Sequence, residues 1–185
     1  MAVNKIISIY NGSPRKTGNT AFATNFLKKE LETIAGAKVK HYSIIDYHID
    51  PCFGCRKCME LKHCTNRKDE FEFLFNTVKN SDITIWGVPV YWFAPPGITK
   101  NFIDRTHAYF VCKPMLHNQK TYIINIGTNS GFETSESVMK SWLEWYGANI
   151  KKSINIFATE INDIKNNNSK IKQLKELTEE IIRNL

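Results

Sequence analysis

Four of the five cysteines gather in one short segment, with two, two and five residues between successive thiols. They are Cys52, Cys55, Cys58 and Cys64. In a protein of the cytoplasm, cysteines spaced so closely are interpreted first as ligands of a metal ion or cluster, because disulfides are rare in that compartment. The segment 51–65 is therefore the first candidate site.

The spacing of these cysteines favours a [4Fe-4S] cluster. Three thiolates at two-residue gaps can surround one face of the cube, and a fourth thiolate a few residues later can complete the ligand set. Gly54 permits a tight bend, while Arg56 and Lys57 offset the negative charge of the thiolates. Four-cysteine zinc sites usually bring together two Cys-x-x-Cys pairs across a longer loop. Zinc and free, redox-active thiols stay open as alternatives.

The second candidate site is a polar turn near the N-terminus. Residues 6–10 form an apolar, β-branched run typical of a buried strand, and helical spacing begins at Phe22. A helix N-terminus has unpaired N–H groups and a partial positive charge, so the turn between them can hold a phosphate. The alternative is an ordinary strand-to-helix turn with Thr20 as its N-cap. The predicted phosphate-binding residues are Ser13, Arg15, Gly18, Asn19 and Thr20.

Two familiar phosphate loops do not match this turn. Gly12 and Gly18 are separated by five residues, and Asn19 stands where a Walker loop needs lysine. The dinucleotide fingerprint needs three glycines, and only one glycine follows Gly12 within the turn. Because side-chain donors are abundant here, the turn suits a terminal monophosphate better than a pyrophosphate.

An aromatic loop follows the apolar run 83–88 and could bind a flat ring. Its aromatic side chains lie between prolines, which restrict the loop, and the backbone N–H groups of Val90 and Tyr91 could reach the polar edge of the ring. The alternative is an aromatic cluster that packs helices. The predicted ring-binding residues are Pro89, Val90, Tyr91, Trp92 and Phe93.

These segments resemble the flavodoxin-like NAD(P)H-dependent FMN reductase superfamily. The resemblance rests on Asn11-Gly12-Ser13-Pro14-Arg15 with Gly18-Asn19-Thr20, and on Pro89-Val90-Tyr91-Trp92 with Pro96-Gly97 and Phe102-Ile103-Asp104-Arg105. By this resemblance Thr128 and Gly131 belong to a third flavin loop, although that loop has fewer glycines than expected. Phe93-Ala94-Pro95 also departs from the smaller residues expected there. The cysteine segment resembles the iron-sulfur flavoprotein branch, cysteine for cysteine.

The resemblance implies an FMN-dependent oxidoreductase or electron-transfer flavoprotein. It would exchange a hydride or electrons between FMN and NAD(P)H or ferredoxin, pass electrons through the cluster to a small-molecule or protein acceptor, and form a homodimer or homotetramer. Since FMN carries the chemistry, no catalytic side chain is expected. Asp104 and Arg105 are interpreted as structural, and His107 as a surface or capping residue. Two rival functions are a cluster-free NAD(P)H-dependent quinone, nitro or flavin reductase, and a zinc- or thiol-bearing binding module without turnover.

Apolar periodicity predicts strands that alternate with helices. This alternation predicts an α/β fold with a parallel sheet and helices on both faces. The fold we expect is a flavodoxin-like three-layer sandwich with strand order 2-1-3-4-5, in which loops 11–20, 89–97 and 127–132 meet at the carboxyl edge of the sheet. The predicted strands cover 6–10, 39–45, 83–88, 122–126 and 154–157. The predicted helices cover 20–34, 69–78, a segment from 98, 135–146 and a closing segment around 171–182.

Length and composition set the remaining expectations. The 185 residues, 42% of them hydrophobic, predict one domain over 1–185 that includes the cysteine-rich loop 51–65. No signal peptide and no apolar run of about 20 residues is evident, so we expect a cytoplasmic protein without a membrane partner. The net charge of +7 is spread along the chain rather than clustered. That pattern gives no reason to expect a nucleic-acid partner.

Overall fold

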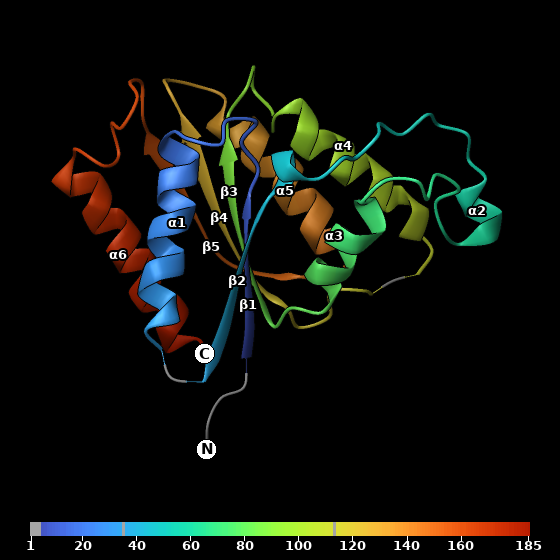
Figure 1. Cartoon of the computed structure of the whole chain (residues 1–185), viewed down its shortest axis with the longest axis horizontal. Coiled ribbons are helices and arrows are strands. Elements are labelled where there is room, and N and C mark those ends of the chain that lie inside the picture. Colours follow the sequence, from blue (N-terminus) through green and yellow to red (C-terminus); the bar gives the residue numbers. More distant parts are fainter. Residues whose placement is uncertain (1–4, 35, 113) are drawn as a thin grey trace.

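The computed structural model describes residues 5–34, 36–112 and 114–185. Within them the chain forms a parallel five-stranded sheet of order β2-β1-β3-β4-β5 between two helical layers (Figure 1). The strands are β1 (Lys5–Asn11), β2 (Ala37–Ser43), β3 (Ile83–Pro89), β4 (Lys120–Gly127) and β5 (Asn149–Phe157). The predicted flavodoxin-like fold class and strand order are confirmed.

Helices cover both faces of the sheet (Figure 1). The first face carries α1 (Asn19–Glu32) and α6 (Asn168–Arg183). The second carries α3 (Phe71–Lys79), α4 (Gly97–Arg105) and α5 (Phe132–Trp145). Successive side chains along a strand point to opposite faces of the sheet, so the core has two parts. Ile9 packs in the cluster beneath α1 and α6, whereas Tyr10 and Trp86 pack in the cluster beneath α3, α4 and α5.

The first helix begins earlier than the sequence analysis predicted. The helix covers Asn19–Glu32 rather than the predicted 20–34, and its N-cap is Gly18, with φ 134°. Thr20, the N-cap of the alternative interpretation, lies within the first helical turn. A glycine tolerates that backbone conformation because it has no Cβ. As a result, the polar turn after β1 runs directly into the first helical N–H groups.

The cysteine segment extends away from the sheet. A short 3-10 helix, η1 (Ile44–Asp46), follows β2, and the chain then passes outside α4 to the single turn α2 (Cys58–Leu61) (Figure 1). A second 3-10 helix, η2 (Thr106–Tyr109), continues from α4. Sequence periodicity did not predict α2, since four residues are too few to show a helical period. None of the described helices has the length and hydropathy that a membrane span requires.

Candidate functional site

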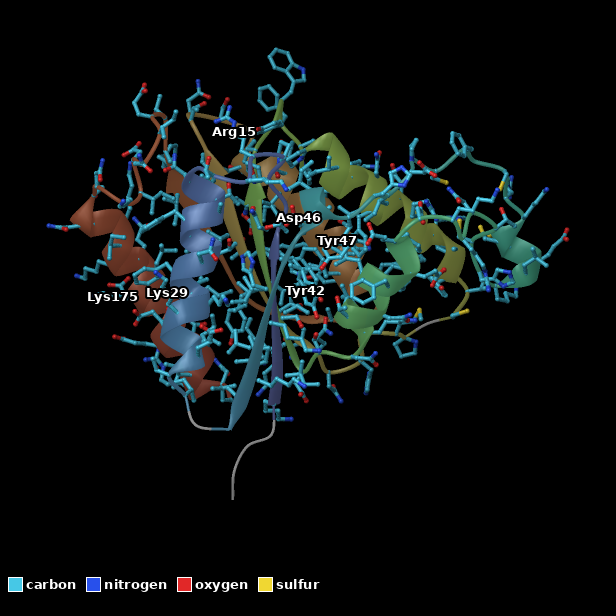
Figure 2. The ribbon with its side chains drawn as sticks, in the orientation of Figure 1. Arg15, Lys29, Tyr42, Asp46, Tyr47 and Lys175 are labelled. Atoms are coloured by element: carbon cyan, nitrogen blue, oxygen red, sulfur yellow. The ribbon has the colours of Figure 1, made fainter. Side chains whose placement is uncertain are left out.

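A pocket of about 710 Å³ opens at the carboxyl edge of the sheet. Its walls come from the turn after β1, the loop after β3, the start of the loop after β4, and residues 158–162 after β5. Figure 2 shows Arg15 at this edge of the molecule. The predicted site residues that line the pocket are Ser13, Arg15, Gly18, Asn19, Thr20, Pro89, Val90, Tyr91 and Thr128. The predicted residues outside its lining are Trp92, Phe93 and Gly131.

The turn after β1 is held in shape by its own side chains. Asn11 Oδ1 accepts a hydrogen bond from the Ser13 amide at 3.1 Å, and Ser13 Oγ accepts one from the Arg15 amide at 3.1 Å. Thr99 of α4 donates to the Gly12 carbonyl at 2.9 Å. A Cβ on Gly12 would lie 2.7 Å from Thr99 Oγ1, so this position requires glycine. These contacts fix the turn before any ligand is present.

The N-terminus of α1 opens toward this pocket without a side-chain cap. By contrast, Asn167 caps α6 by accepting hydrogen bonds from the amides of Ser169 and Lys170. The first-turn N–H groups of α1 can therefore bind an anion. The side chain of Asn19 has a different role from the one predicted. Its Nδ2 donates to the Glu160 carbonyl at 2.9 Å, and its Oδ1 accepts a hydrogen bond from the Ile164 backbone amide at 3.2 Å.

The aromatic loop after β3 forms a tight hairpin. The backbone of Tyr91 and Ala94 exchanges hydrogen bonds of 2.8 and 3.1 Å, which places Trp92 and Phe93 at φ 47° and 65°. The side chain of Trp92 is 92% exposed. The amide of Val90 donates to the Ile126 carbonyl at 2.7 Å. The N–H groups of Val90 and Tyr91 are thus bonded within the protein, contrary to the prediction that they reach a ring, because the sheet and the hairpin take both donors.

Gly131 supports this hairpin from the loop after β4. Its φ of 84° favours glycine, and a Cβ there would lie 2.9 Å from the Phe93 Cα. Gly131 therefore determines where Phe93 lies, although it is not part of the pocket lining.

A second cavity, of about 540 Å³, is lined by all four clustered cysteines. Its opposite wall comes from the end of α4 and from η2, including Asp104, Arg105 and His107. Cys52 and Cys55 are exposed, whereas Cys58 and Cys64 are partly buried. Among the described residues, no group of three or more His, Cys, Asp or Glu side chains is placed to hold a single metal ion.

The thiols in this cavity have different environments. Hydrogen bonds from the Lys57 amide and the Thr65 hydroxyl lower the pKa of Cys55. Burial raises the pKa of Cys58, and the charges of the other three cysteines raise it further. His107 Nδ1 lies 3.8 Å from Cys58 Sγ, so this histidine contacts the cysteine site rather than solvent alone. The four sulfurs are close enough to influence one another.

A buried ion pair lies behind the cysteine cavity. Arg105 donates to Asp69 from both terminal nitrogens, at 2.5 and 3.3 Å, and the two side chains are 1% and 0% exposed. The adjacent Asp104 instead pairs with Lys100 on the surface of α4. Sequence reasoning interpreted Arg105 as structural but missed its partner, since Asp69 is far away in sequence and was assigned only to the first turn of a helix.

Comparison with known proteins defines the family. The model of the NADPH-dependent FMN reductase family matches residues 4–162. The chain belongs to this family. It is therefore an oxidoreductase of the NADPH-dependent FMN reductase family.

Relatives of this FMN reductase family member include iron-sulfur flavoproteins. It is 28% identical over 152 residues to one from Clostridioides difficile (strain 630), covering 82% of this chain and 67% of that protein. It is 36% identical over 104 residues to one from Methanocaldococcus jannaschii, covering 55% of this chain and 51% of that protein. The chain thus spans two thirds of the first relative and about half of the archaeal one.

Solved structures agree with the fold. An NADH:FMN oxidoreductase in its apo form superposes with a TM-score of 0.70 at 16% identity, covering 98% of this chain and 90% of that one. A Streptococcus mutans protein, Smu.1420, superposes with a TM-score of 0.72 at 20% identity, covering 98% and 100%. Likeness at this level of identity shows the flavodoxin-like fold alone.

Proposed function

We propose that this FMN reductase family member binds FMN in the pocket at the carboxyl edge of its sheet. The observation that carries the proposal is the uncapped N-terminus of α1 beside a turn already fixed by Asn11 and Ser13. That arrangement presents unpaired N–H groups and the Arg15 guanidinium to one cavity, as a terminal phosphate requires.

The remaining walls of the pocket suit the rest of the cofactor. Pro89, Val90 and Tyr91 give an apolar side on which a flat ring can rest, and Thr128 adds a hydroxyl from the adjacent loop. Trp92 and Phe93 would contact the ring from the rim of the pocket, where the absence of a side chain on Gly131 leaves room for Phe93. When bound, FMN supplies the redox chemistry by accepting a hydride from reduced nicotinamide. The protein residues bind it, orient it and exclude water from one side.

We propose that Cys52, Cys55, Cys58 and Cys64 are the ligands of a [4Fe-4S] cluster in the cysteine cavity. Four thiols line one cavity, and its lining also includes Arg56, Lys57 and Arg105. Positive charge near four thiolates favours their ionised form and offsets the charge of a cluster. Gly54 adopts φ 64° between the first two cysteines, a conformation in which glycine permits a tight bend.

For the wider reaction we propose NAD(P)H or ferredoxin as electron donor and a small-molecule or protein acceptor. We also propose a homodimer or homotetramer in the cytoplasm. Among the described residues, five large apolar side chains stay exposed at the pocket end of the sheet, which supports burial against a second copy. They are Tyr91, Trp92, Phe93, Phe157 and Ile161.

The proposed function can be tested by purification without oxygen, followed by a visible spectrum and analysis of flavin, iron and zinc. Bound FMN with about four irons per chain supports the proposal. FMN without metal would favour the cluster-free reductase, and zinc without flavin the non-catalytic binding module. A chain that stays colourless after incubation with excess FMN would contradict the FMN site itself.

A further inference from the structure

Both ends of the cysteine segment are attached to one buried guanidinium. Arg105 Nη1 donates to the Asp50 carbonyl at 3.0 Å, just before the segment 51–65. Arg105 Nη2 donates to the Asn66 carbonyl at 2.8 Å, just after it. The guanidinium therefore bridges the two points where the segment leaves the body of the protein and returns to it.

Further hydrogen bonds close the base of the segment around the same group. The Asp50 amide donates to Asp69 Oδ2 at 2.9 Å, and Asn66 Nδ2 donates to Asp50 Oδ2 at 2.7 Å. Asp69 also receives the guanidinium of Arg105. These bonds join four side chains and two backbone carbonyls into one connected network. A connected hydrogen-bond network of this kind restricts the geometry of the groups that it joins.

One donor of Arg105 stays unused by the network. Arg105 Nε is buried and has no hydrogen-bond partner among the described residues, although Arg105 and Cys64 line the same cavity. A buried donor without a partner calls for an acceptor. The sulfur of Cys64 lines the same cavity and can accept a hydrogen bond.

We infer that Arg105 is the positioning residue of the cysteine site. It holds both ends of the segment 51–65 through Asp69 and two carbonyls before any cluster is present, and its unpartnered Nε–H would donate to the sulfur of Cys64 once a cluster is bound. The second part rests on the proposed function, since only a bound cluster gives that sulfur a redox role. Hydrogen bonds to cluster sulfurs raise the reduction potential. Arg105 would thus organise the ligands and also tune the cluster.

Two variants test this inference without leaving a buried charge unpaired. Arg105→Lys keeps the charge opposite Asp69 but cannot reach both carbonyls, because lysine lacks the planar fork. The double variant Arg105→Met with Asp69→Leu replaces the ion pair with apolar side chains, which proteins often tolerate. The matched control is Lys152→Met, which breaks the Lys152–Glu180 ion pair between β5 and α6.

The first measurement is hydrogen exchange in the metal-free protein. The amides of Leu61 and Lys62 bond to the carbonyls of Lys57 and Cys58 at 3.1 and 2.9 Å, and they touch neither Arg105 nor Asp69 directly. We expect their exchange to accelerate at least about tenfold in both test variants, which corresponds to ~1.4 kcal/mol of local stability, and to stay unchanged in Lys152→Met. Unchanged exchange in both test variants would overturn the positioning role.

The second measurement is the reduction potential after reconstitution with iron and sulfide without oxygen. We expect a more negative potential in the double variant, a smaller shift in Arg105→Lys, and equal FMN content in all proteins. Equal potentials in all three loaded proteins would overturn the tuning role. A wild-type chain that takes up no iron would overturn that role together with the proposed cluster, whereas the exchange measurement would still decide the positioning role.

Discussion

The two cavities of this protein are built in different ways. The pocket at the carboxyl edge belongs to the sheet itself, because its walls continue from β1, β3, β4 and β5 and its turn is fixed by neighbouring backbone. The cysteine cavity lies outside the sheet, in a segment attached by the network of Arg105 and Asp69. Helix α4 lies between them: Thr99 near its start supports the turn after β1, and Arg105 at its end lines the cysteine cavity.

Because of this difference, we expect that either site can be disrupted while the other keeps its structure. Damage at the turn after β1 should alter the pocket and leave the cysteine segment in place. Damage to the ion pair should loosen the cysteine segment and leave the pocket formed. The predictions below test that independence, beginning with the largest expected effect.

The largest effect is expected from Cys58→Ala. A cluster held by four thiolates loses a ligand, so we expect essentially all iron to be lost while FMN is retained. Iron analysis and the flavin spectrum of protein purified without oxygen check this. Ser13→Ala, in the other cavity, is the control and should keep its iron. Full iron occupancy in Cys58→Ala would show that the four cysteines are not the ligand set.

Asp69→Asn should cost the most stability. It leaves the buried Arg105 guanidinium without its carboxylate, and breaking one partner of a buried pair costs about 3–5 kcal/mol. Urea unfolding measures the loss, and the double variant Arg105→Met with Asp69→Leu should recover most of it. If the double variant is as unstable as Asp69→Asn, the network contributes more through its backbone contacts than through its charges.

Gly12→Ala should damage the pocket alone. Its Cβ would lie 2.7 Å from Thr99 Oγ1 and 3.1 Å from the Gly87 carbonyl, and overpacking of this kind costs about 1–3 kcal/mol. We expect weaker FMN binding, measured by flavin fluorescence titration, with iron content unchanged. Adding Thr99→Ser should not relieve the clash, because serine keeps the hydroxyl, whereas Thr99→Ala should relieve part of it.

The sequence predicted the sheet well, because hydrophobic periodicity is a local signal. The run 83–88 has the pattern of a buried strand, and the four cysteines indicate a shared site from their spacing alone. The acceptor to which each hydrogen-bond donor binds could not be predicted in this way. The Val90 amide bonds to Ile126, and Arg105 bonds to Asp69, across stretches of chain that no local pattern connects. Such pairings depend on how the folded elements meet.

Acid should weaken the network that holds the cysteine segment. Burial acts to raise the pKa of Asp69, but hydrogen bonds from Arg105 and the Asp50 amide outweigh it, so that pKa lies below its ordinary value. The stabilising contribution of Asp69 is therefore complete above about pH 4, the ordinary range of an aspartate, and is lost as the pH falls through the lowered pKa. Unfolding measured from about pH 5 to about pH 2 should show a smaller acid effect in the double variant, which has no carboxylate at this position. An equal acid effect in both proteins would place the responsible carboxylate elsewhere.

The smallest effect is expected at the hairpin after β3. Trp92 and Phe93 adopt positive φ, a conformation that suits Asn and Gly in a two-residue turn and strains larger residues. Trp92→Asn with Phe93→Gly should therefore raise stability by roughly 1 kcal/mol, as urea unfolding without FMN would show. If the aromatic side chains cover the ring from the rim, the same variant should bind FMN more weakly. Greater stability with unchanged FMN affinity would show that the two aromatic side chains do not contact FMN. Their strained backbone would then point to a different contact at this surface.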